Sequence, residues 1–351
     1  LYSSSAASDV YKRQNPSWAA TYPSGPIDLV DMGELVEFMV AAVEHYSPAP
    51  YYVTHWEFYN EPDNSEIWRA KNGGWGYFGP NPQAYVDILS AVYAPMKAAD
   101  PEAQIVFGGI AYDNWTTEGG PFAKEFLDGV LQNGGGDFFD VMNFHYYLYF
   151  RDRWDPYGIG ITGKVNALRE KLASHGVDKP FICTETSMWS DDLHGGSDEL
   201  QSRYVAKVFA RSMATDLKIS IWFMLSEDPG PTAVKYGLVD SQLNPKPSLG
   251  AYQTAAQQLG PSRYLRTLSP DESGSDQIEA YEFLSENGSS QIIVAWTNDE
   301  APHSFTLAKD QVVVVGKFGG ESTVNDGDDG KLDGQTEVTL GPSPVYLRFQ
   351  P

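Results

Sequence analysis

Apolar residues follow two alternating patterns between residues 27 and 259 of the chain. Helical spacing of apolar residues predicts helices over residues 27–46, 82–99, 121–132, 162–175, 198–216 and 247–259. Runs rich in aromatic and β-branched residues predict strands that begin near residues 53, 104, 141, 181 and 219. Because strands that alternate with helices are typical of βαβ units, the pattern predicts an α/β fold with a parallel sheet.

Single residues predict two details of these helices. Asp198–Gln201 fits a capping box, which predicts the start of the helix over residues 198–216. Pro95 lies inside the helix over residues 82–99 and predicts a kink or a boundary there.

Beyond Gly260 the pattern changes to short runs of alternating apolar and polar residues. Residues 263–351 contain such runs, separated by turns, and show no helical spacing. This pattern predicts a small antiparallel β-sandwich. The acidic stretch 325–334 lacks the spacing of acids and glycine that a calcium loop needs, so a hairpin turn is the better interpretation.

Two predicted strands end in a glutamate. The strand from Val53 runs into Glu61, and it ends there because Pro62 cannot donate to a ladder. A second apolar strand, Phe181–Glu185, also ends in a carboxylate. The carboxyl ends of parallel strands meet at one edge of the sheet, where active sites form. Two glutamates so placed are the minimum for hydrolysis of a glycosidic bond, and both carboxyls are expected to face one shared space.

Other side chains near the predicted strand ends allow more than one interpretation. Glu57 lies within its strand and is interpreted as structural, whereas Glu227 and Asp228, just past the last strand, are the main rivals for a catalytic role. His145 is either a core histidine or a site residue, and Trp222 is either a core residue or a platform for a sugar ring.

The loop from Asn64 to Pro82 follows the strand end that carries Glu61. It contains aromatic residues among several glycines, and Trp75 is the candidate in it for contact with a sugar. Loops at the carboxyl ends of parallel strands often carry function. Aromatic residues make up 13% of the chain, and about half of them fit the core of predicted strands and helices.

Composition narrows the classes of partner. The net charge of -23 and the pI near 4.5 argue against a nucleic acid, which favours a basic surface, and against an anionic membrane. No apolar run is long enough to span a bilayer. The single cysteine, Cys183, excludes a disulfide within the chain and is interpreted as a small core residue. A neutral carbohydrate is compatible with this charge.

The strand end Asn60-Glu61-Pro62, with a second glutamate at the end of the third strand after it, resembles the retaining glycoside hydrolases of clan A. The barrel of that clan carries the acid/base after strand four and the nucleophile after strand seven, which the order of strands here matches. The resemblance covers residues 15–262. The C-terminal sandwich is similar to one found in several of these families, including the β-xylosidases of family 39. The family, 39-like or 5-like, is left open.

The resemblance implies roles for the two glutamates and their neighbour. Glu61 is similar to the general acid/base and Glu185 to the nucleophile. Asn60 matches the asparagine that hydrogen-bonds the 2-hydroxyl of the sugar. No cofactor and no metal is implied.

The resemblance also implies substrate-binding residues on the other strands. His145 or Tyr146, at the end of the strand near residue 141, resembles the group that orients the nucleophile. Trp222 resembles the platform under the sugar in the cleaved subsite.

The predicted strands are fewer than a complete barrel requires. Five strands match strands four to eight of a (β/α)8 barrel, so strands one to three are expected upstream of residues 15–262. Residues 4–14 resemble a translated transposase sequencing adapter, and residues 1–14 are therefore interpreted as an artefact of a metagenomic fragment. Residues 263–351 are the expected accessory domain. Any signal peptide would lie in the missing part, and a secreted or periplasmic location is favoured.

The expected function is a retaining β-glycosidase that hydrolyses plant or algal β-glycans, or their oligosaccharides, by double displacement. The fragment itself is expected to aggregate or to lack activity, because two edges of its sheet would lie open. One alternative is a carbohydrate-binding barrel protein without turnover. Another is a metal-dependent barrel enzyme such as an enolase-type lyase, which would need acids on successive strand ends. The sugar, the linkage, endo or exo action and the oligomeric state are not indicated by the sequence.

Overall fold

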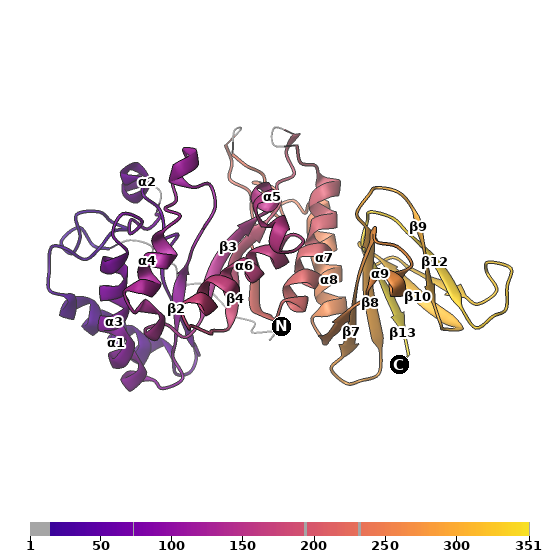
Figure 1. Cartoon of the computed structure of the whole chain (residues 1–351), viewed down its shortest axis with the longest axis horizontal. Coiled ribbons are helices and arrows are strands. Elements are labelled where there is room, and N and C mark those ends of the chain that lie inside the picture. The colour runs from indigo at the N-terminus through magenta and orange to yellow at the C-terminus, as the bar shows by residue number, and fades with distance from the viewer. Residues whose placement is uncertain (1–14, 73, 193–194, 231–232, 351) are drawn as a thin grey trace. The chain divides into compact units, whose positions relative to one another are not determined.

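The computed structural model describes residues 15–72, 74–192, 195–230 and 233–350, which Figure 1 shows coloured along the chain. The expected artefact at residues 1–14 lies outside the described residues. The chain divides into two compact units. The first holds residues up to Thr186 together with Leu217–Ile221, and the second holds Ser187–Asp216 and the chain from Trp222 onward.

The first unit is built on strands that follow one another in space as they do in sequence. β1 (His55–Asn60) pairs in parallel with β2 (Gln104–Gly109). Two parallel bridges, Val106–Val141 and Ile110–Phe144, join β2 to β3 (Met142–Tyr147). β3, β4 (Phe181–Ser187) and β5 (Leu217–Trp222) are neighbours in that order. The predicted α/β fold is confirmed, while the assignment of these strands to places four to eight of a barrel stays a prediction.

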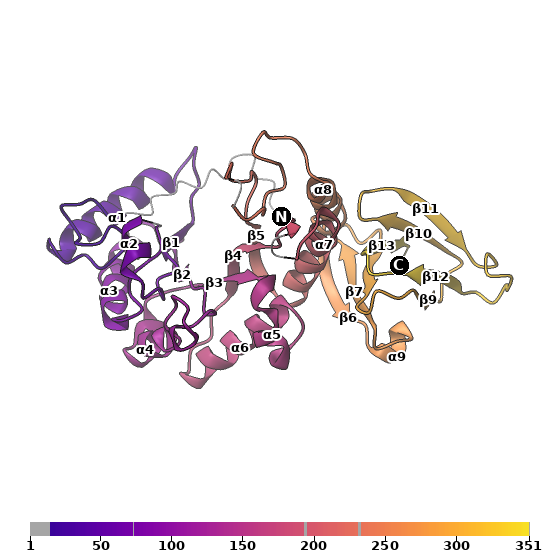
Figure 2. The ribbon, with the colours of Figure 1, turned by 90° about the horizontal axis from the view of Figure 1, so that it is seen from above.

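Helices alternate with these strands. α1 (Met32–Tyr46), α3 (Pro82–Ala99), α4 (Phe126–Gln132) and α6 (Ile161–Ser174) occupy the predicted places, and the short α2 (Ile67–Asn72) and α5 (Arg151–Trp154) lie in loops. In Figure 2, α4 and α6 lie on the same side of the strands. α1 starts at Met32 rather than residue 27 because the side chain of Asp31 accepts a hydrogen bond from the Gly33 N–H and caps the helix. α3 continues through Pro95, which is therefore not a boundary.

Aromatic packing fixes β1 and β2 relative to the helices. The ring of Phe107 on β2 lies 5.0 Å from that of Tyr85 on α3 and 6.3 Å from that of Phe126 on α4, centroid to centroid. The buried hydroxyl of Tyr85 donates to the Phe58 carbonyl and accepts from the Gly108 N–H. One hydroxyl thus links both strands. This contact holds the carboxyl ends of β1 and β2 side by side.

The second unit begins with α7 (Asp198–Ala214) and α8 (Pro247–Leu259). Ser197 is the N-cap of α7, because its side chain accepts from the Leu200 N–H. The predicted capping box at Asp198–Gln201 is therefore wrong by one residue. Asp198 instead lies in the first turn, where its negative charge favours the helix dipole.

Antiparallel strands complete the second unit. One sheet has the order β11-β10-β13-β8-β7-β6, and a second pairs β12 with β9. The strands are β6 (Ser262–Thr267), β7 (Ile278–Ser285), β8 (Gln291–Thr297), β9 (His303–Leu307), β10 (Gln311–Gly316), β11 (Glu321–Asn325), β12 (Thr336–Leu340) and β13 (Val345–Phe349). Side chains of both sheets, such as Ile293 on β8 and Phe305 on β9, share one apolar core. The predicted antiparallel β-sandwich arrangement is present.

Three features of this part of the chain differ from expectation. The short helix α9 (Pro270–Ser273) was not predicted, although Ser269 and Glu272 form a capping box at its start. β6 and β11 were not predicted either. The expected hairpin turn at residues 325–334 is wrong, because β11 pairs with β10 and β12 with β9, so the loop passes from one sheet to the other.

A buried ion pair joins α7 to β7 in this unit. The guanidinium of Arg211 donates to both carboxylate oxygens of Glu279, at 2.7 Å each. The hydroxyl of Tyr281 donates to the same carboxylate at 2.6 Å. Only 7% of the Arg211 side chain and 9% of the Glu279 side chain are exposed, so water screens this pair little.

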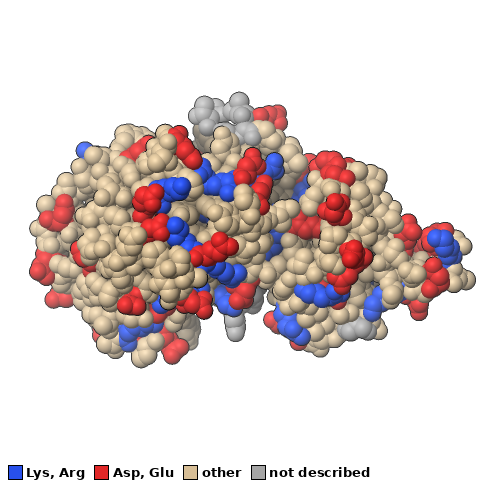
Figure 3. Space-filling model, in the orientation of Figure 1, with Lys and Arg blue, Asp and Glu red and all other residues tan. Residues whose placement is uncertain are grey.

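Charged side chains of both signs are interspersed on the face that Figure 3 shows. The acidic residues on this face are scattered rather than gathered in one patch. Among the helices of the described residues, none combines the length and the hydropathy that a membrane span requires.

Candidate functional site

Glu61 follows the last residue of β1 in an unusual backbone conformation. Its φ is 46°, and that of Tyr59 two residues earlier is 64°. Residues other than glycine rarely adopt such angles, and strain of this kind is found at functional sites. The Glu61 N–H donates to the Gly109 carbonyl at 3.0 Å, which keeps the residue beside the end of β2. Pro62 then ends the ladder, as the sequence predicted.

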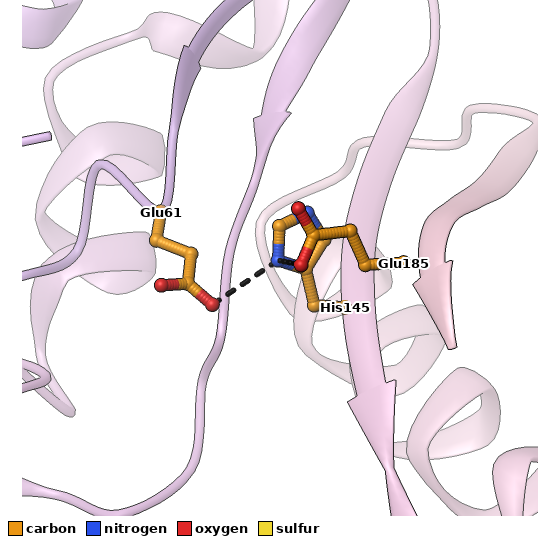
Figure 4. A group of neighbouring side chains, drawn as sticks. All are labelled: Glu61, His145 and Glu185. Atoms are coloured by element: carbon orange, nitrogen blue, oxygen red, sulfur yellow. Dashed lines mark hydrogen bonds and ion pairs between the residues drawn. The ribbon is translucent and has the colours of Figure 1, made fainter. Parts of the chain in front are cut away.

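Three side chains from three strand ends converge beside β2. Nδ1 of His145, on β3, lies 3.1 Å from Oε1 of Glu61 and 3.4 Å from Oε2 of Glu185, on β4. One donor atom from each residue lies within 4.8 Å of the other two. Figure 4 shows dashed lines from the imidazole to both carboxyl groups. The exposed fractions of the side chains are 1% for His145, 9% for Glu61 and 12% for Glu185.

Tyr147, rather than Tyr146, contacts the predicted nucleophile. Its hydroxyl donates to Oε2 of Glu185 at 2.7 Å. Successive side chains of a strand point to opposite faces, so Tyr147 shares the face of His145 while Tyr146 points the other way and is buried. The sequence places Tyr147 at this strand end, but the resemblance assigned a role only to His145 or Tyr146. The alternation along β3 could have identified it, because His145 and Tyr147 are two residues apart.

The imidazole ring of His145 is held from its other side. Its Nε2 lies 3.4 Å from Oγ1 of Thr184, which also accepts a hydrogen bond from the Asn143 side chain. Gly109 leaves the space that the ring fills, because a Cβ atom at this position would lie 2.1 Å from Nε2. These contacts fix the orientation of the ring and direct Nδ1 at the two glutamates.

The electrostatics of the site favour positive charge between the carboxyls. Burial raises the pKa of Glu61, and the charge of Glu185 adds to this, whereas the hydrogen bond with His145 acts against it. Burial alone would lower the pKa of His145. The charge of Glu185 and the hydrogen bond with Glu61 outweigh it and raise the pKa to about 9. At neutral pH the ring is therefore an imidazolium, and Glu61 holds a proton more firmly than an exposed glutamate.

Two further buried acids support the strand ends. Asp63 accepts hydrogen bonds from the N–H groups of Ala111 and Tyr112, and burial raises its pKa to about 7. Asp113 pairs with the fully buried ammonium of Lys164 at 3.1 Å. Lys164 also donates to the Ala111 carbonyl. The loop after β2 is thus tied both to the segment after Glu61 and to α6. Sequence reasoning missed both acids, since neither lies within a recognised motif.

The remaining predicted residues occupy different places. Asn60, directly before Glu61, is buried. Trp75 is half-buried, and the guanidinium of Arg69 lies 4.8 Å from the centre of its ring. Trp222 belongs to the second unit, where it is buried and its indole N–H donates to the Tyr236 carbonyl at 3.1 Å. The structure therefore brings together Glu61, His145 and Glu185.

The rival carboxylates have partners of their own. Oε1 of Glu57 accepts from the Gly109 N–H at 2.9 Å, which fits the structural interpretation. Glu227 forms an ion pair with the ammonium of Lys246, and both side chains are 9% exposed. Asp228 is exposed, and its carbonyl accepts from Lys235.

The sequence has no match among known families or curated proteins. A scan against protein-family models finds no matching family, and a search of the curated proteins finds no match.

Solved structures do match. A family 39 glycoside hydrolase from the gut symbiont Bacteroides cellulosilyticus WH2 matches with a TM-score of 0.66 at 20% identity, covering 93% of this chain and 63% of that one. A glucosidase from Croceicoccus marinus matches with a TM-score of 0.64 at 17% identity, covering 94% and 76%. A family 30 endoxylanase from Clostridium papyrosolvens C71 matches with a TM-score of 0.59 at 14% identity, covering 93% and 73%.

These matches concern the fold. The chain has the fold of glycoside hydrolases of clan A, so the resemblance inferred from the Asn60-Glu61-Pro62 strand end is confirmed at that level, with the family unresolved. The chain spans 63% of the length of the family 39 structure. At sequence identities of 20% and below, a shared fold does not show that two proteins catalyse the same reaction or bind the same substrate.

Proposed function

We propose that the chain contains the catalytic pair of a retaining β-glycosidase, with Glu61 as general acid/base and Glu185 as nucleophile. The observation that carries this proposal is the approach of the two carboxyls. An oxygen atom of Glu61 lies within 4.8 Å of an oxygen atom of Glu185. Retaining enzymes place the two carboxyl groups about 5–5.5 Å apart, whereas inverting enzymes leave room for a water with about 6.5–9.5 Å.

The surroundings of the two acids support these separate roles. Glu61 is the more buried, and burial raises its pKa, which suits a group that must deliver a proton near neutral pH. Glu185 accepts a hydrogen bond from Tyr147 and lies 3.4 Å from the imidazole of His145. Both contacts stabilise a carboxylate and orient its oxygens. An ionised, oriented carboxylate is what attack on an anomeric carbon requires.

Hydrolysis then takes two steps. In the first, an oxygen of Glu185 bonds to the anomeric carbon while the bond to the leaving oxygen breaks and Glu61 gives that oxygen its proton. The charge of Glu185 disappears in the glycosyl-enzyme, so the pKa of Glu61 falls and its carboxylate can act as a base. In the second step Glu61 takes a proton from water, the water oxygen bonds to the anomeric carbon, and Glu185 leaves.

The substrate we propose is a neutral β-linked carbohydrate, of the plant or algal β-glycan class. The acidic net charge of -23 is compatible with a neutral polymer, and the fold neighbours include a glucosidase and an endoxylanase. Asn60, beside Glu61, is the proposed partner of the 2-hydroxyl. Trp222 and Trp75 are the proposed platforms for sugar rings.

We also propose an organisation for the chain. We assign β1 to β5 to strands four to eight of a (β/α)8 barrel, residues 15–262 to its C-terminal part, and residues 263–351 to an accessory sandwich. A secreted or periplasmic location is the one we favour. In this arrangement the carboxyl ends of β1, β3 and β4, which carry Glu61, His145 and Glu185, lie on the catalytic face of the barrel.

A mechanism-based label tests the pair without requiring full turnover. The chain is incubated with activated 2-deoxy-2-fluoro glycosides of a panel of sugars, and peptides are analysed by mass spectrometry. We expect one glycosyl unit on Glu185, no label in Glu185→Gln, and retained labelling in Glu61→Gln, because a good leaving group needs no acid. Labelling at another carboxylate would disprove the assignment of the nucleophile.

A carbohydrate-binding protein without turnover is the competing class. Such a protein would bind oligosaccharides equally well in Glu185→Gln and wild type, and it would form no covalent adduct with any sugar of the panel. Binding measured by calorimetry beside the labelling experiment separates the two classes.

A further inference from the structure

The three side chains at the centre of the site also have the spacing of metal ligands. Their donor atoms are Nδ1 of His145 and one carboxylate oxygen each of Glu61 and Glu185, all within 4.8 Å of one another. Within the described residues, no second group of three His, Cys, Asp or Glu side chains has donor atoms this close together.

The distances fit a tetrahedral ion. A zinc ion with ligand bonds of about 2.0–2.1 Å separates neighbouring ligand atoms by about 3.3 Å. Two of the three separations here are 3.1 Å, from His145 to Glu61, and 3.4 Å, from His145 to Glu185. The third, between the two glutamates, is at most 4.8 Å. Rotation of a glutamate carboxyl group about its terminal torsion, which is broad, brings the two oxygens to the separation of about 3.3 Å.

One carboxylate oxygen of the site lacks a hydrogen-bond partner. Oε2 of Glu61 is buried and has no hydrogen-bond partner among the described residues, and the side chain is only 9% exposed. A buried carboxylate oxygen without a partner costs free energy. A bound cation satisfies it, because the carboxylate can turn either oxygen to the ion or share both.

The contacts around the three residues resemble the outer contacts of metal ligands. The second ring nitrogen of His145 faces the hydroxyl of Thr184 at 3.4 Å. The ligating oxygen of Glu185 accepts from Tyr147 at 2.7 Å. Such contacts orient the ligands before the ion arrives.

We propose that this site binds one zinc ion through His145, Glu61 and Glu185, with the fourth position open to water. Binding releases the Nδ1 proton of the imidazolium to solvent, because a ring nitrogen ligates a metal only when it is deprotonated. One imidazole and two carboxylates suit zinc, whereas magnesium and calcium favour oxygen ligands alone. The ion is an inhibitor rather than a cofactor, because it occupies both carboxyls that the proposed hydrolysis uses. Inhibition rests on the proposed function; binding of zinc does not.

Two other histidine–carboxylate pairs provide matched controls. His175 lies 3.2 Å from Asp128, but that carboxylate also holds the ammonium of Lys171 at 2.7 Å. His303 lies 2.8 Å from Asp299, and among the described residues this pair belongs to no group of three converging ligand atoms. Neither pair offers the three converging donors of the site.

Titration calorimetry of the whole chain with zinc chloride, after treatment with a chelator, tests the proposal. We expect one site per chain, with the affinity reduced at least about tenfold in each of Glu61→Gln, Glu185→Gln and His145→Asn. His175→Asn and His303→Asn should bind as the wild type does. Cobalt(II) in the same site should give the intense visible bands of tetrahedral rather than octahedral coordination.

Several results would overturn the proposal. These are no binding at millimolar zinc, unchanged binding in all three site variants, or binding lost in His175→Asn or His303→Asn. Far-UV circular dichroism checks the fold of each variant, and if His145→Asn fails to fold, the two isosteric glutamine variants decide the result. A chain that binds zinc but takes no glycosyl label contradicts the proposed hydrolysis and leaves the zinc site standing.

Discussion

The hydroxyl of Tyr147 donates a hydrogen bond of 2.7 Å to Oε2 of Glu185, the same oxygen that lies 3.4 Å from Nδ1 of His145. Two donors therefore converge on one carboxylate oxygen at the end of β4. This arrangement distinguishes Glu185 from Glu61, whose Oε1 lies 3.1 Å from His145 and whose Oε2 has no hydrogen-bond partner among the described residues.

Removal of the tyrosine hydroxyl should slow attack by Glu185. A hydrogen bond to a charged group contributes about 1.5–3 kcal/mol. Tyr147→Phe should therefore reduce the rate of labelling by the fluoro-glycoside about 10- to 100-fold. Tyr157→Phe, at a half-exposed position outside the site, is the control and should label at the rate of the wild type. Equal rates in both variants would show that the hydroxyl does not act on Glu185.

A methyl group on Gly109 should displace the imidazole of His145. The added Cβ would lie 2.1 Å from Nε2, and the backbone of Gly109 is not in the left-handed region, so the clash rather than the backbone decides the effect. Gly109→Ala should destabilise the fold by about 1–3 kcal/mol, as overpacking does, and weaken zinc binding. Urea unfolding and calorimetry measure the two effects.

Gly320→Ala is the matched control for this substitution, because nothing lies within 4 Å of its added Cβ. It should leave zinc binding unchanged. If Gly109→Ala binds zinc and unfolds as Gly320→Ala does, the ring of His145 is not confined as described.

The stability of the chain should fall as the pH rises from neutral to about 9. The pKa of His145 is raised from 6.5 to about 9 in the folded state, so folding binds a proton that the unfolded chain releases. The stabilisation is complete below pH 6.5 and disappears as the pH passes about 9. The raised pKa of Glu61 acts in the same direction.

Urea unfolding of wild type and His145→Asn at several pH values checks this expectation. The loss of unfolding free energy between pH 6.5 and 9 should be larger in the wild type than in the variant. A wild type whose stability rises over this interval relative to the variant would contradict the charge assigned to the ring.

The ion pair between Arg211 and Glu279 should stabilise the folded second unit. Glu279→Gln leaves a buried guanidinium without its counter-charge, which typically destabilises by about 3–5 kcal/mol. Glu300→Gln removes one of the two carboxylate partners of Arg203, at a site where the glutamate side chain is 70% exposed, and such pairs contribute about 0–1 kcal/mol. Thermal unfolding should therefore separate the two variants clearly, and equal unfolding temperatures would show that the buried pair is dispensable.

The local parts of the fold were predictable because they depend on neighbouring residues. The alternation of strands and helices from residue 53 to residue 259 follows from apolar spacing, and the end of β1 follows from Pro62. Element ends were predicted less well. The cap at Ser197 and the helix at Pro270–Ser273 depend on one or two hydrogen bonds, which a hydrophobic pattern does not reveal.

Some residues of the candidate site could be identified from the sequence and others could not. The two glutamates could be named from the sequence because each follows a recognisable strand, and parallel strands bring their carboxyl ends to one edge. Alternation along β3 could have placed Tyr147 on the face of His145, but its partner Glu185 could not be named from the sequence. The pair of Lys164 with Asp113 could not be named either, because these residues lie far apart along the chain.

By itself, the sequence determined most of the strands and helices between residues 27 and 259 and which strand ends carry acids, because backbone preference and apolar periodicity act over a few residues. Tertiary structure alone decided that His145 contacts both acids, that the hydroxyl of Tyr147 reaches Oε2 of Glu185, and that the loop at residues 325–334 passes between sheets. These outcomes depend on strand register and on distances across the fold. Both result from contacts between residues that are far apart in the sequence.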